Sequence, residues 1–280
     1  MTMKKTSRAK SPGLWLAHIL LGFLSLMALF PFLWMVATSF KQTTVLFRWP
    51  PEFIPKSPTT ANYVSLWTQS DFVYWMKNSV IISAVVTTIS LLFNSMAAYS
   101  FAKRSFPGRD ILFLLVLGTL MVPGQVTLVP VFLLISKLKW VNTYQAMILP
   151  LVAGPFGIFL MRQYMVTIPD ALIDAARIDG CSEFGIFTGI ILPLVKPALA
   201  ALAVFAFQGS WNSFLWPLVV TTTSKMRTLP VGLAVYQAQF TTQWGLVMAG
   251  ATLTMIPVLV FFLLFQRYFV EGLALTGIKG

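Results

Sequence analysis

Long apolar segments alternate with polar connections along the 280-residue chain. An apolar helix of about 20 residues is long enough to cross the hydrocarbon core of a bilayer, which is about 30 Å thick. The pattern therefore predicts an all-α, polytopic membrane protein with six transmembrane helices and both chain ends on one side. The predicted spans cover residues 14–38, 78–102, 111–136, 143–161, 198–220 and 244–266.

One connection, residues 170–197, differs from the others because its sequence predicts helix and yet contains charged residues. It holds half of the eight acidic residues, namely Asp170, Asp174, Asp179 and Glu183. Asp170 is suited to cap the start of a short amphipathic helix, and Gly180 is suited to a left-handed turn at its end. A second helical piece is expected to end at Leu192-Pro193. We interpret this segment as a protruding loop that a partner protein grips.

The composition supports a membrane protein and indicates its orientation. Only 10% of the residues are charged and the mean hydropathy is +0.79, whereas soluble domains carry about 25% charged residues. The net charge of +12 arises from basic residues at span ends and in short loops, which is typical of membrane orientation rather than nucleic-acid binding. With the N-terminus inside, 12 of the 20 basic residues are cytoplasmic and 8 are outside. Both termini and the 170–197 segment are therefore predicted to be cytoplasmic, and the Pro-rich residues 41–77 to be outside.

Residues that carry chemistry are scarce. Spans two to six contain no Asp, Glu, Lys, Arg or His between their ends, and the first contains only His18, which we interpret as interfacial. This argues against proton-coupled transport and predicts neither a catalytic nor a metal site. The sequence lacks a GxxxxGK[ST] phosphate loop, so energy for uphill transport has to come from another protein. The single cysteine, Cys181, excludes an internal disulfide, and residues 14–37 are too long for a cleavable signal.

The 170–197 segment carries a spaced motif. It consists of Asp174-Ala175-Ala176, then Gly180, then Ile190-x-Leu192-Pro193. The motif resembles the EAA loop of bacterial ABC importer permeases, in which EAA, three residues, a glycine, nine residues and I-x-L-P follow one another. Asp174 stands where that pattern has glutamate, so the acidic side chain is one methylene shorter. The resemblance implies the type I importer (MetI-like) permease fold.

Further stretches narrow the resemblance to the smaller, six-span permease of maltose-type carbohydrate uptake systems. Such a resemblance implies import of a sugar, in particular a di- or oligosaccharide, through the bacterial inner membrane. The similar stretches are FPFLWMVATSFK at 30–41, ANY at 61–63, Asn78-Ser79, AAYSFAKRSFPGR at 97–109, MVP at 121–123, IFLMRQY at 158–164, WNSFLWP at 211–217 and TGIKG at 276–280.

The resemblance also implies partners and roles. In the family this loop docks in a cleft of the ATPase and its acid pairs with an arginine, a role that falls to Asp174. The implied partners are a second, homologous permease, two ATP-binding subunits that hold ATP and Mg, and an extracytoplasmic sugar-binding protein; no cofactor is implied for this chain. The implied regions are 1–72 with the tail, first span and outer loop, 73–270 as permease core, and 271–280 as cytoplasmic tail. The residues implied for ATPase coupling are Asp174, Ala175, Ala176, Asp179, Gly180, Ile190, Leu192 and Pro193.

Two sets of residues are candidates for the substrate pathway. The third and fourth spans are interrupted at Pro123-Gly124 and Gly154-Pro155, and irregular backbone inside a membrane is tolerated where it is buried or lines a cavity. Kinking for helix packing is the alternative. In the fifth span Gln208, Trp211 and Asn212 share one helix face, and an indole with amides suits a sugar ring. The alternative here is a belt tryptophan with amides that bond a neighbouring helix.

Two other functions stay open at this point. One is a permease of the same superfamily for a glycerol-phosphate compound or a peptide. The scarcity of basic residues in the spans argues mildly against a phosphorylated substrate, which favours Arg or Lys in its path. The other is a membrane-embedded enzyme, which needs clustered His, Asp, Glu or Cys at membrane depth.

Overall fold

The computed structural model describes residues 12–42, 50–239 and 243–277 of the chain, and these form helices and connecting loops without strands. The chain divides into two compact units. Unit 1 comprises Met1–Gln69 and Phe240–Leu253, and unit 2 comprises Ser70–Gln239 and Thr254–Gly280. Most of the predicted N-terminal tail and residues 278–280 lie outside the described residues. This architecture confirms the all-α fold class predicted from the hydropathy pattern.

The elements follow one another in a single order. They are α1 Pro12–Ser39, α2 Ala61–Gln69, α3 Phe72–Lys103, α4 Arg109–Thr119, α5 Gly124–Lys137, α6 Tyr144–Ile148, η2 Leu149–Leu151, α7 Pro155–Val166, α8 Asp170–Ile178, α9 Glu183–Ile186, η3 Phe187–Ile191, α10 Leu192–Leu194, α11 Lys196–Trp211, α12 Leu215–Val220, η4 Ser224–Met226, α13 Leu229–Gln239 and α14 Trp244–Gly277.

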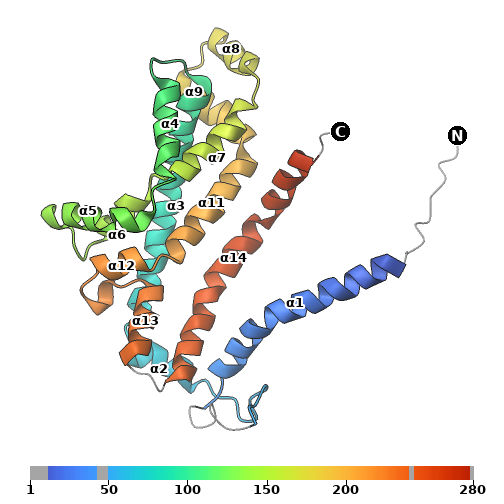
Figure 1. The fold of residues 1–280 in the computed structure, drawn as a ribbon, viewed down its shortest axis with the longest axis vertical. Coiled ribbons are helices and arrows are strands. Elements are labelled where there is room, and N and C mark those ends of the chain that lie inside the picture. Colours follow the sequence, from blue (N-terminus) through green and yellow to red (C-terminus); the bar gives the residue numbers. More distant parts are fainter. Residues whose placement is uncertain (1–11, 43–49, 240–242, 278–280) are drawn as a thin grey trace. The chain divides into compact units, whose positions relative to one another are not determined.

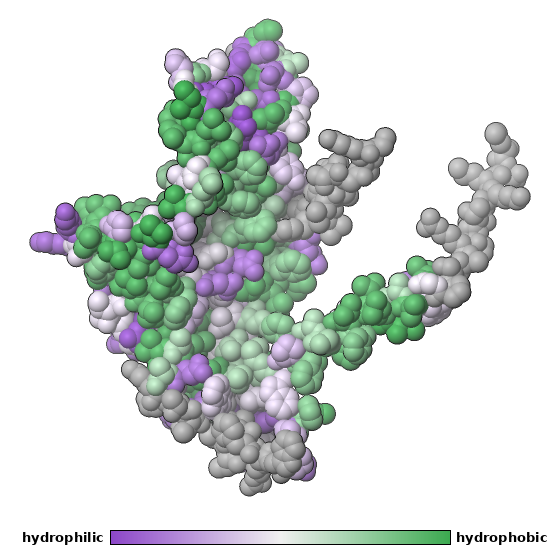
Figure 2. Space-filling view, in the orientation of Figure 1, coloured by the Kyte–Doolittle hydropathy of each residue, from purple (hydrophilic) through white to green (hydrophobic). Residues whose placement is uncertain are grey.

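Within the described residues, three helices are long and apolar enough to cross a membrane, and up to six spans result if each bent pair of helices counts as one. The long helices are α1, α3 and α14, within the ranges Gly13–Ser39, Phe72–Lys103 and Trp244–Gln266. The bent pairs are α4 with α5 at 99°, α6–η2 with α7 at 41°, and the 183–194 helices with α11 at 84°. Figure 2 shows hydrophobic residues along most of α1 and over much of the visible face of unit 2.

The predicted helix breaks at Pro123-Gly124 and Gly154-Pro155 are confirmed. Pro123 precedes the first residue of α5, and Gly154 precedes Pro155, the first residue of α7. A proline at a helix start loses no intrahelical hydrogen bond, since the first N–H groups have no partner there. Each proline therefore begins a new helix at a new direction.

Three predicted boundaries are wrong. The polar region 41–77 contains α2 and the first turns of α3, which begins at Phe72 rather than residue 78. The connection after the fifth span contains α13, a helix of 11 residues. The fifth span itself does not run unbroken to residue 220, because α11 ends at Trp211 and α12 starts at Leu215. Helices α2, α12 and α13 have at most 11 residues, too few for a hydropathy pattern over about 20 residues to resolve.

In unit 1 the side chain of Asn62 closes the C-terminal end of α1. Its amide Nδ2 donates hydrogen bonds to the carbonyl oxygens of Ser39 at 2.7 Å and Lys41 at 2.8 Å. The Ser39 hydroxyl lies 2.7 Å from the hydroxyl of Tyr63. Carbonyls at a helix end lack intrahelical partners, so α2 supplies them here. This contact gives the ANY stretch a structural role.

In unit 2 the long helix α3 packs along α7 and α11. Its buried face carries small polar residues, a composition that lets helix backbones approach closely in a membrane. They are Ser79, Ser83, Thr87, Ser90, Asn94 and Ser95. Figure 1 shows α8 and α9 at one end of α3 and α13 at the other.

Side chains near the start of α3 hold the loop that precedes α13. Asn78 Nδ2 donates to the carbonyls of Lys225 at 2.8 Å and Arg227 at 2.9 Å. The indole Nε1 of Trp75 donates to the carbonyl of Ser224 at 2.8 Å. The Ser79 hydroxyl accepts from the backbone N–H of Leu229 at 2.7 Å. The Asn78-Ser79 stretch thus fixes the entry into α13.

Candidate functional site

The 170–197 segment folds as two helical pieces joined by a tight turn. After α8 the backbone N–H of Gly180 donates to Arg177 O at 3.1 Å, and that of Cys181 donates to Ala176 O at 2.9 Å. These two bonds form a Schellman motif with Gly180 in the left-handed position, at φ +77°. Ser182 then caps α9 through its hydroxyl, which accepts from Gly185 N at 3.1 Å. The predicted role of Gly180 in ending the first helix is confirmed.

Helix α8 has one buried and one exposed face. Ile173 and Ala176 are buried in a core that also contains residues of α3, α7, η3 and α11. Asp174, Ala175 and Gly180 are exposed. The two alanines of the motif therefore differ in role: Ala176 packs inward and Ala175 faces outward.

The exposed face of α8 also carries apolar residues that sequence reasoning did not single out. Leu172 is 45% exposed and Ile178 is 87% exposed, and both are spaced three residues from Ala175. Such a spacing places all three on one face of the helix. An apolar ridge beside an acidic residue is a typical feature of a protein-binding surface. The signal that could have found it is the three-residue spacing of Leu172, Ala175 and Ile178.

The second half of the predicted motif has a packing role. Ile190 and Leu192 are partly buried and pack against the same core as Ala176. Pro193 is exposed and lies in the first turn of α10. Residues Phe187–Ile191 form a π-helical stretch that joins α9 to α10. The structure thus brings Asp174, Ala175, Asp179 and Gly180 to the exposed part of the segment, and assigns Ile190 and Leu192 to its support.

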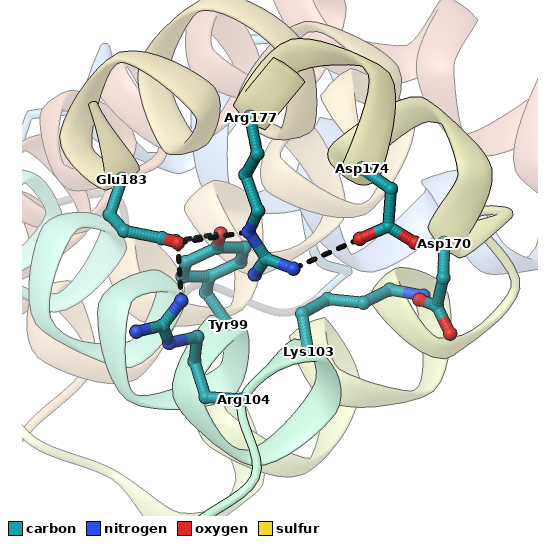
Figure 3. Close-up of polar contacts among 7 residues, drawn as sticks. All are labelled: Tyr99, Lys103, Arg104, Asp170, Asp174, Arg177 and Glu183. Carbon is teal, nitrogen blue, oxygen red and sulfur yellow. Dashed lines mark hydrogen bonds and ion pairs between the residues drawn. The ribbon is translucent and has the colours of Figure 1, made fainter. Parts of the chain in front are cut away.

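Ionic contacts connect both helical pieces to the end of α3 (Figure 3). The Glu183 carboxylate accepts from the Tyr99 hydroxyl at 2.9 Å, from Arg177 Nε at 3.1 Å and from Arg104 Nη1. Arg177 also donates from Nη1 to Asp174 Oδ1 at 3.0 Å. The hydrogen bond that the Arg177 guanidinium donates to Glu183 raises the pKa of Arg177 above its ordinary value. Glu183 is therefore a shared acceptor for three different segments.

A second contact holds the start of α8. Lys103 Nζ donates to Asp170 Oδ1 at 2.7 Å and also to the Ile168 carbonyl, and its side chain is only 3% exposed. The Lys103 hydrogen bond and charge lower the pKa of the Asp170 carboxyl below its ordinary value. The predicted capping role of Asp170 is wrong, because Pro169 is the N-cap residue and Asp170 lies in the first turn. Its carboxylate pairs across to α3 instead.

The residues at the helix breaks line two open cavities within unit 2. The larger, of about 490 Å³, is bordered by Gly124, Gln125 and Thr127 of α5 and by residues before the second break. The smaller, of about 280 Å³, is bordered by Gly154 and by Ser90, Asn94 and Ser210. Leu151 borders both cavities. Pro123 and Pro155 adjoin the lining residues Gly124 and Gly154 and set the direction of the helices there.

Asn94 joins the second break to α3. Its Oδ1 accepts from the backbone N–H of Gly154 at 3.2 Å, and its Nδ2 donates to Ser90 Oγ at 2.7 Å. A backbone N–H at a helix start has no intrahelical partner, so the amide of Asn94 supplies one. The sequence reasoning did not identify Asn94, since its partner is 60 residues away.

The three candidates in α11 lie in different environments. Trp211 is 1% exposed, stacks on Phe207 and donates from Nε1 to Thr254 O of α14 at 3.3 Å. The indole itself bonds the neighbouring helix, whereas the alternative expected a tryptophan at the membrane surface and assigned that bond to the amides. Gln208 and Asn212 are exposed. A substrate role for Gln208 and Asn212 stays a prediction.

Comparison with known proteins identifies the family. The model of the family "Binding-protein-dependent transport system inner membrane component" matches residues 90–274. The chain is 44% identical over 277 residues to the arabinooligosaccharides transport system permease protein AraQ of Halalkalibacterium halodurans, covering 98% of this chain and 99% of the relative. It is 38% identical to the trehalose/maltose transport system permease protein MalG of Thermococcus litoralis, covering 92% and 94%.

Two further similarities bear on substrate class and fold. The chain is 36% identical to the sn-glycerol-3-phosphate transport system permease protein UgpE of Yersinia enterocolitica, over 91% of this chain and 94% of the relative. Its fold matches one chain in the crystal structure of a bacterial ABC transporter involved in import of the acidic polysaccharide alginate, with a TM-score of 0.82, 23% identity, and coverage of 94% and 98%. The chain therefore belongs to the family of inner membrane components of binding-protein-dependent transport systems, as a multi-pass permease subunit.

Proposed function

We propose that this chain is the permease of an ATP-driven importer for a sugar, in particular an oligosaccharide. The observation that carries the proposal is the 44% identity to an arabinooligosaccharide permease over nearly the whole of both chains. The two cavities have uncharged linings in which a few polar side chains stand among apolar ones, and this supports a sugar, because hydroxyl groups need hydrogen-bonding partners rather than ionic ones. Gln125, Thr127, Ser90 and Asn94 are the groups that would meet a substrate there.

The exposed face of α8 is proposed to dock on a separate ATPase. Asp174, Ala175, Asp179 and Gly180 form this surface, with Leu172 and Ile178 as its apolar part. Two ATP-binding subunits, a second homologous permease and an extracytoplasmic binding protein complete the proposed assembly. Both termini and α8 lie on the cytoplasmic side in this proposal, within a permease core of residues 73–270 that is flanked by regions 1–72 and 271–280.

The alternative substrate is a glycerol-phosphate compound, because the UgpE relative is an sn-glycerol-3-phosphate transport system permease protein. Phosphate sites are typically built from Arg and Lys side chains that form charge-assisted hydrogen bonds. Neither cavity has an Arg or Lys among the described residues that line it. Because the identity to this relative is also lower, at 36%, the sugar is favoured.

Uptake of labelled oligosaccharides tests the proposed function. A strain that lacks this permease but keeps its binding protein and ATPase is expected to lose uptake of arabinose-containing or maltose-type oligosaccharides. The plasmid-borne chain is expected to restore it. The purified chain alone is expected to hydrolyse no ATP, since its sequence has no phosphate loop. Restored uptake of sn-glycerol-3-phosphate without uptake of any sugar would favour the alternative substrate. ATP hydrolysis by the isolated chain would contradict the proposal that a separate ATPase supplies the energy.

Substitution of Asp174 is expected to weaken docking without abolishing it. Asp174→Ala removes a charge-assisted contact, which contributes about 1–3 kcal/mol to an interface, and it also frees Arg177 Nη1. Asp174→Glu is expected to be nearly silent, because it restores the residue of the family motif and can still reach Arg177. The measurement is co-purification of the ATPase together with uptake. Asp71→Ala, an acid outside the segment whose side chain makes no capping bond, is the matched control; equal losses in both alanine variants would contradict a specific role of Asp174.

A further inference from the structure

Helix α8 is connected to α3 near both of its ends. At its start, Asp170 pairs with Lys103, the last residue of α3. At its end, Arg177 pairs with Glu183, which also accepts from Tyr99 of α3 and from Arg104 just beyond it. Figure 3 shows Tyr99, Arg104 and Arg177 converging on Glu183, and Lys103 beside Asp170 apart from them. The two connections leave little freedom for α8 to move independently of α3.

Glu183 is the centre of the connection at the end of α8. A single exposed ion pair contributes about 0–1 kcal/mol, so no one contact here would hold two helices together. A network differs, because each hydrogen bond polarises the next and one carboxylate orients three donors. The three donors come from three places: α3, the turn after α3, and α8. Loss of the Glu183 charge therefore weakens every link of this connection at once.

The Arg177 guanidinium links Glu183 to the exposed docking face. Its Nη1 donates to Asp174, while its Nε donates to Glu183. When Asp174 engages a cation of the ATPase, Arg177 retains its bond to Glu183, because separate nitrogen atoms make the two contacts. A displacement imposed on the docking face would thus reach Glu183 through one rigid, planar group.

We propose that Glu183 is a positioning residue that fixes the docking helix α8 to α3, so that movement of α8 by the ATPase is transmitted to α3. This inference rests on the proposed function. Its consequence inside the membrane follows from packing: α3 runs along α7 and α11, and all three border the cavity that contains Ser90 and Asn94. The path from ATPase to cavity then runs directly through α3 and not only along the chain from α8 to α11.

Glu183→Gln tests this assignment, because it keeps the size of the side chain and removes its charge. The ATPase is expected to co-purify as in the wild type, since the exposed face of α8 is unchanged. Uptake per ATP hydrolysed in the presence of the binding protein is expected to fall at least about fivefold, the lower end of typical coupling effects. Tyr99→Phe, which removes one of the three donors, is expected to show a smaller loss in the same direction.

The matched control is Asp110→Asn. It removes an ion pair with Arg109, 2.9 Å long, from the same short turn region after α3, without contact to the 170–197 segment. Its uptake per ATP is expected to equal that of the wild type. If Glu183→Gln does not accumulate in the membrane, the test rests on Tyr99→Phe, whose uptake per ATP hydrolysed is then compared with that of Asp110→Asn.

A covalent bridge gives the converse result. In a Cys181→Ser background, Tyr99→Cys and Glu183→Cys joined by a cleavable bifunctional thiol reagent are expected to restore uptake per ATP, and cleavage of the bridge is expected to abolish it again. Equal losses of uptake and hydrolysis in Glu183→Gln, or no recovery on bridging, would overturn the positioning role. Failure of the proposed function is seen separately, as absence of sugar uptake by the wild type in the same assay.

Discussion

Gly180→Leu is expected to abolish transport and ATPase docking while the chain still inserts into the membrane. Gly180 has φ +77°, where a side chain costs about 1–2 kcal/mol. Apart from Gly180 and its two chain neighbours, no atom of the described residues lies within 4 Å of the position that a Cβ would take. A leucine there thus meets no obstacle within its own chain and points into the space that the partner ATPase is proposed to occupy. The measurement is co-purification of the ATPase together with sugar uptake.

Gly108→Leu separates backbone strain from collision with the partner. Gly108 has φ +79°, and among the described residues it too has no atom within 4 Å of its Cβ position. It precedes α4, outside the 170–197 segment. The two variants carry similar strain, so only Gly180→Leu is expected to lose the ATPase. Asparagine tolerates positive φ, so Gly180→Asn is expected to retain an amount of ATPase between those of Gly180→Leu and Gly108→Leu. Wild-type docking and uptake in Gly180→Leu would show that this segment is not the coupling element.

Gly232→Ala is expected to give the largest loss of stability among helix glycines. A Cβ at Gly232 would lie 2.6 Å from Cε2 of Trp75 and closer still to other atoms of that ring. Trp75 is 2% exposed and its Nε1 is bonded to Ser224 O, so the ring has no free space to move into. Overpacking of this kind costs about 1–3 kcal/mol. The expected result is a lower midpoint of thermal aggregation in detergent.

Gly118→Ala is the control for helix propensity. Gly118 lies in α4, and in the described part of the chain nothing is within 4 Å of its Cβ position. Alanine there is expected to be neutral or stabilising by up to about 1 kcal/mol. Trp75→Leu combined with Gly232→Ala is expected to lose less than the sum of the single changes, because the smaller side chain makes room. An unchanged midpoint in Gly232→Ala would contradict the close packing of α13 on α3.

Features with a local cause were predictable from sequence. Apolar length predicted the spans, and proline geometry predicted the breaks before Gly124 and at Gly154. The left-handed turn at Gly180 follows from its position directly after a short amphipathic helix. Each of these depends on residues within one or two turns of the chain, where backbone sterics and hydropathy decide the outcome.

Features that depend on distant partners were not predictable. Lys103 and Arg104 counted in the sequence only as charges that set membrane orientation, yet they bind Asp170 and Glu183, which are 67 and 79 residues away. The sequence predicted Asp170 as a helix cap, but its carboxylate forms an ion pair with Lys103 of α3. Trp211 looked like a sugar platform, and the fold buries it against α14. Short helices such as α2 and α13 were missed because tertiary contacts, not hydropathy, stabilise them.

The only cysteine of the chain provides a ready site for spectroscopic labelling. Cys181 is exposed and directly follows the left-handed residue at the end of α8. Its backbone is held by the hydrogen bond to Ala176 O, so a fluorophore on its sulfur would report the position of this turn with little backbone motion. Wild-type protein could then be labelled at one place without prior removal of other thiols. Changes in emission on adding the ATPase and nucleotide would follow docking and release in real time.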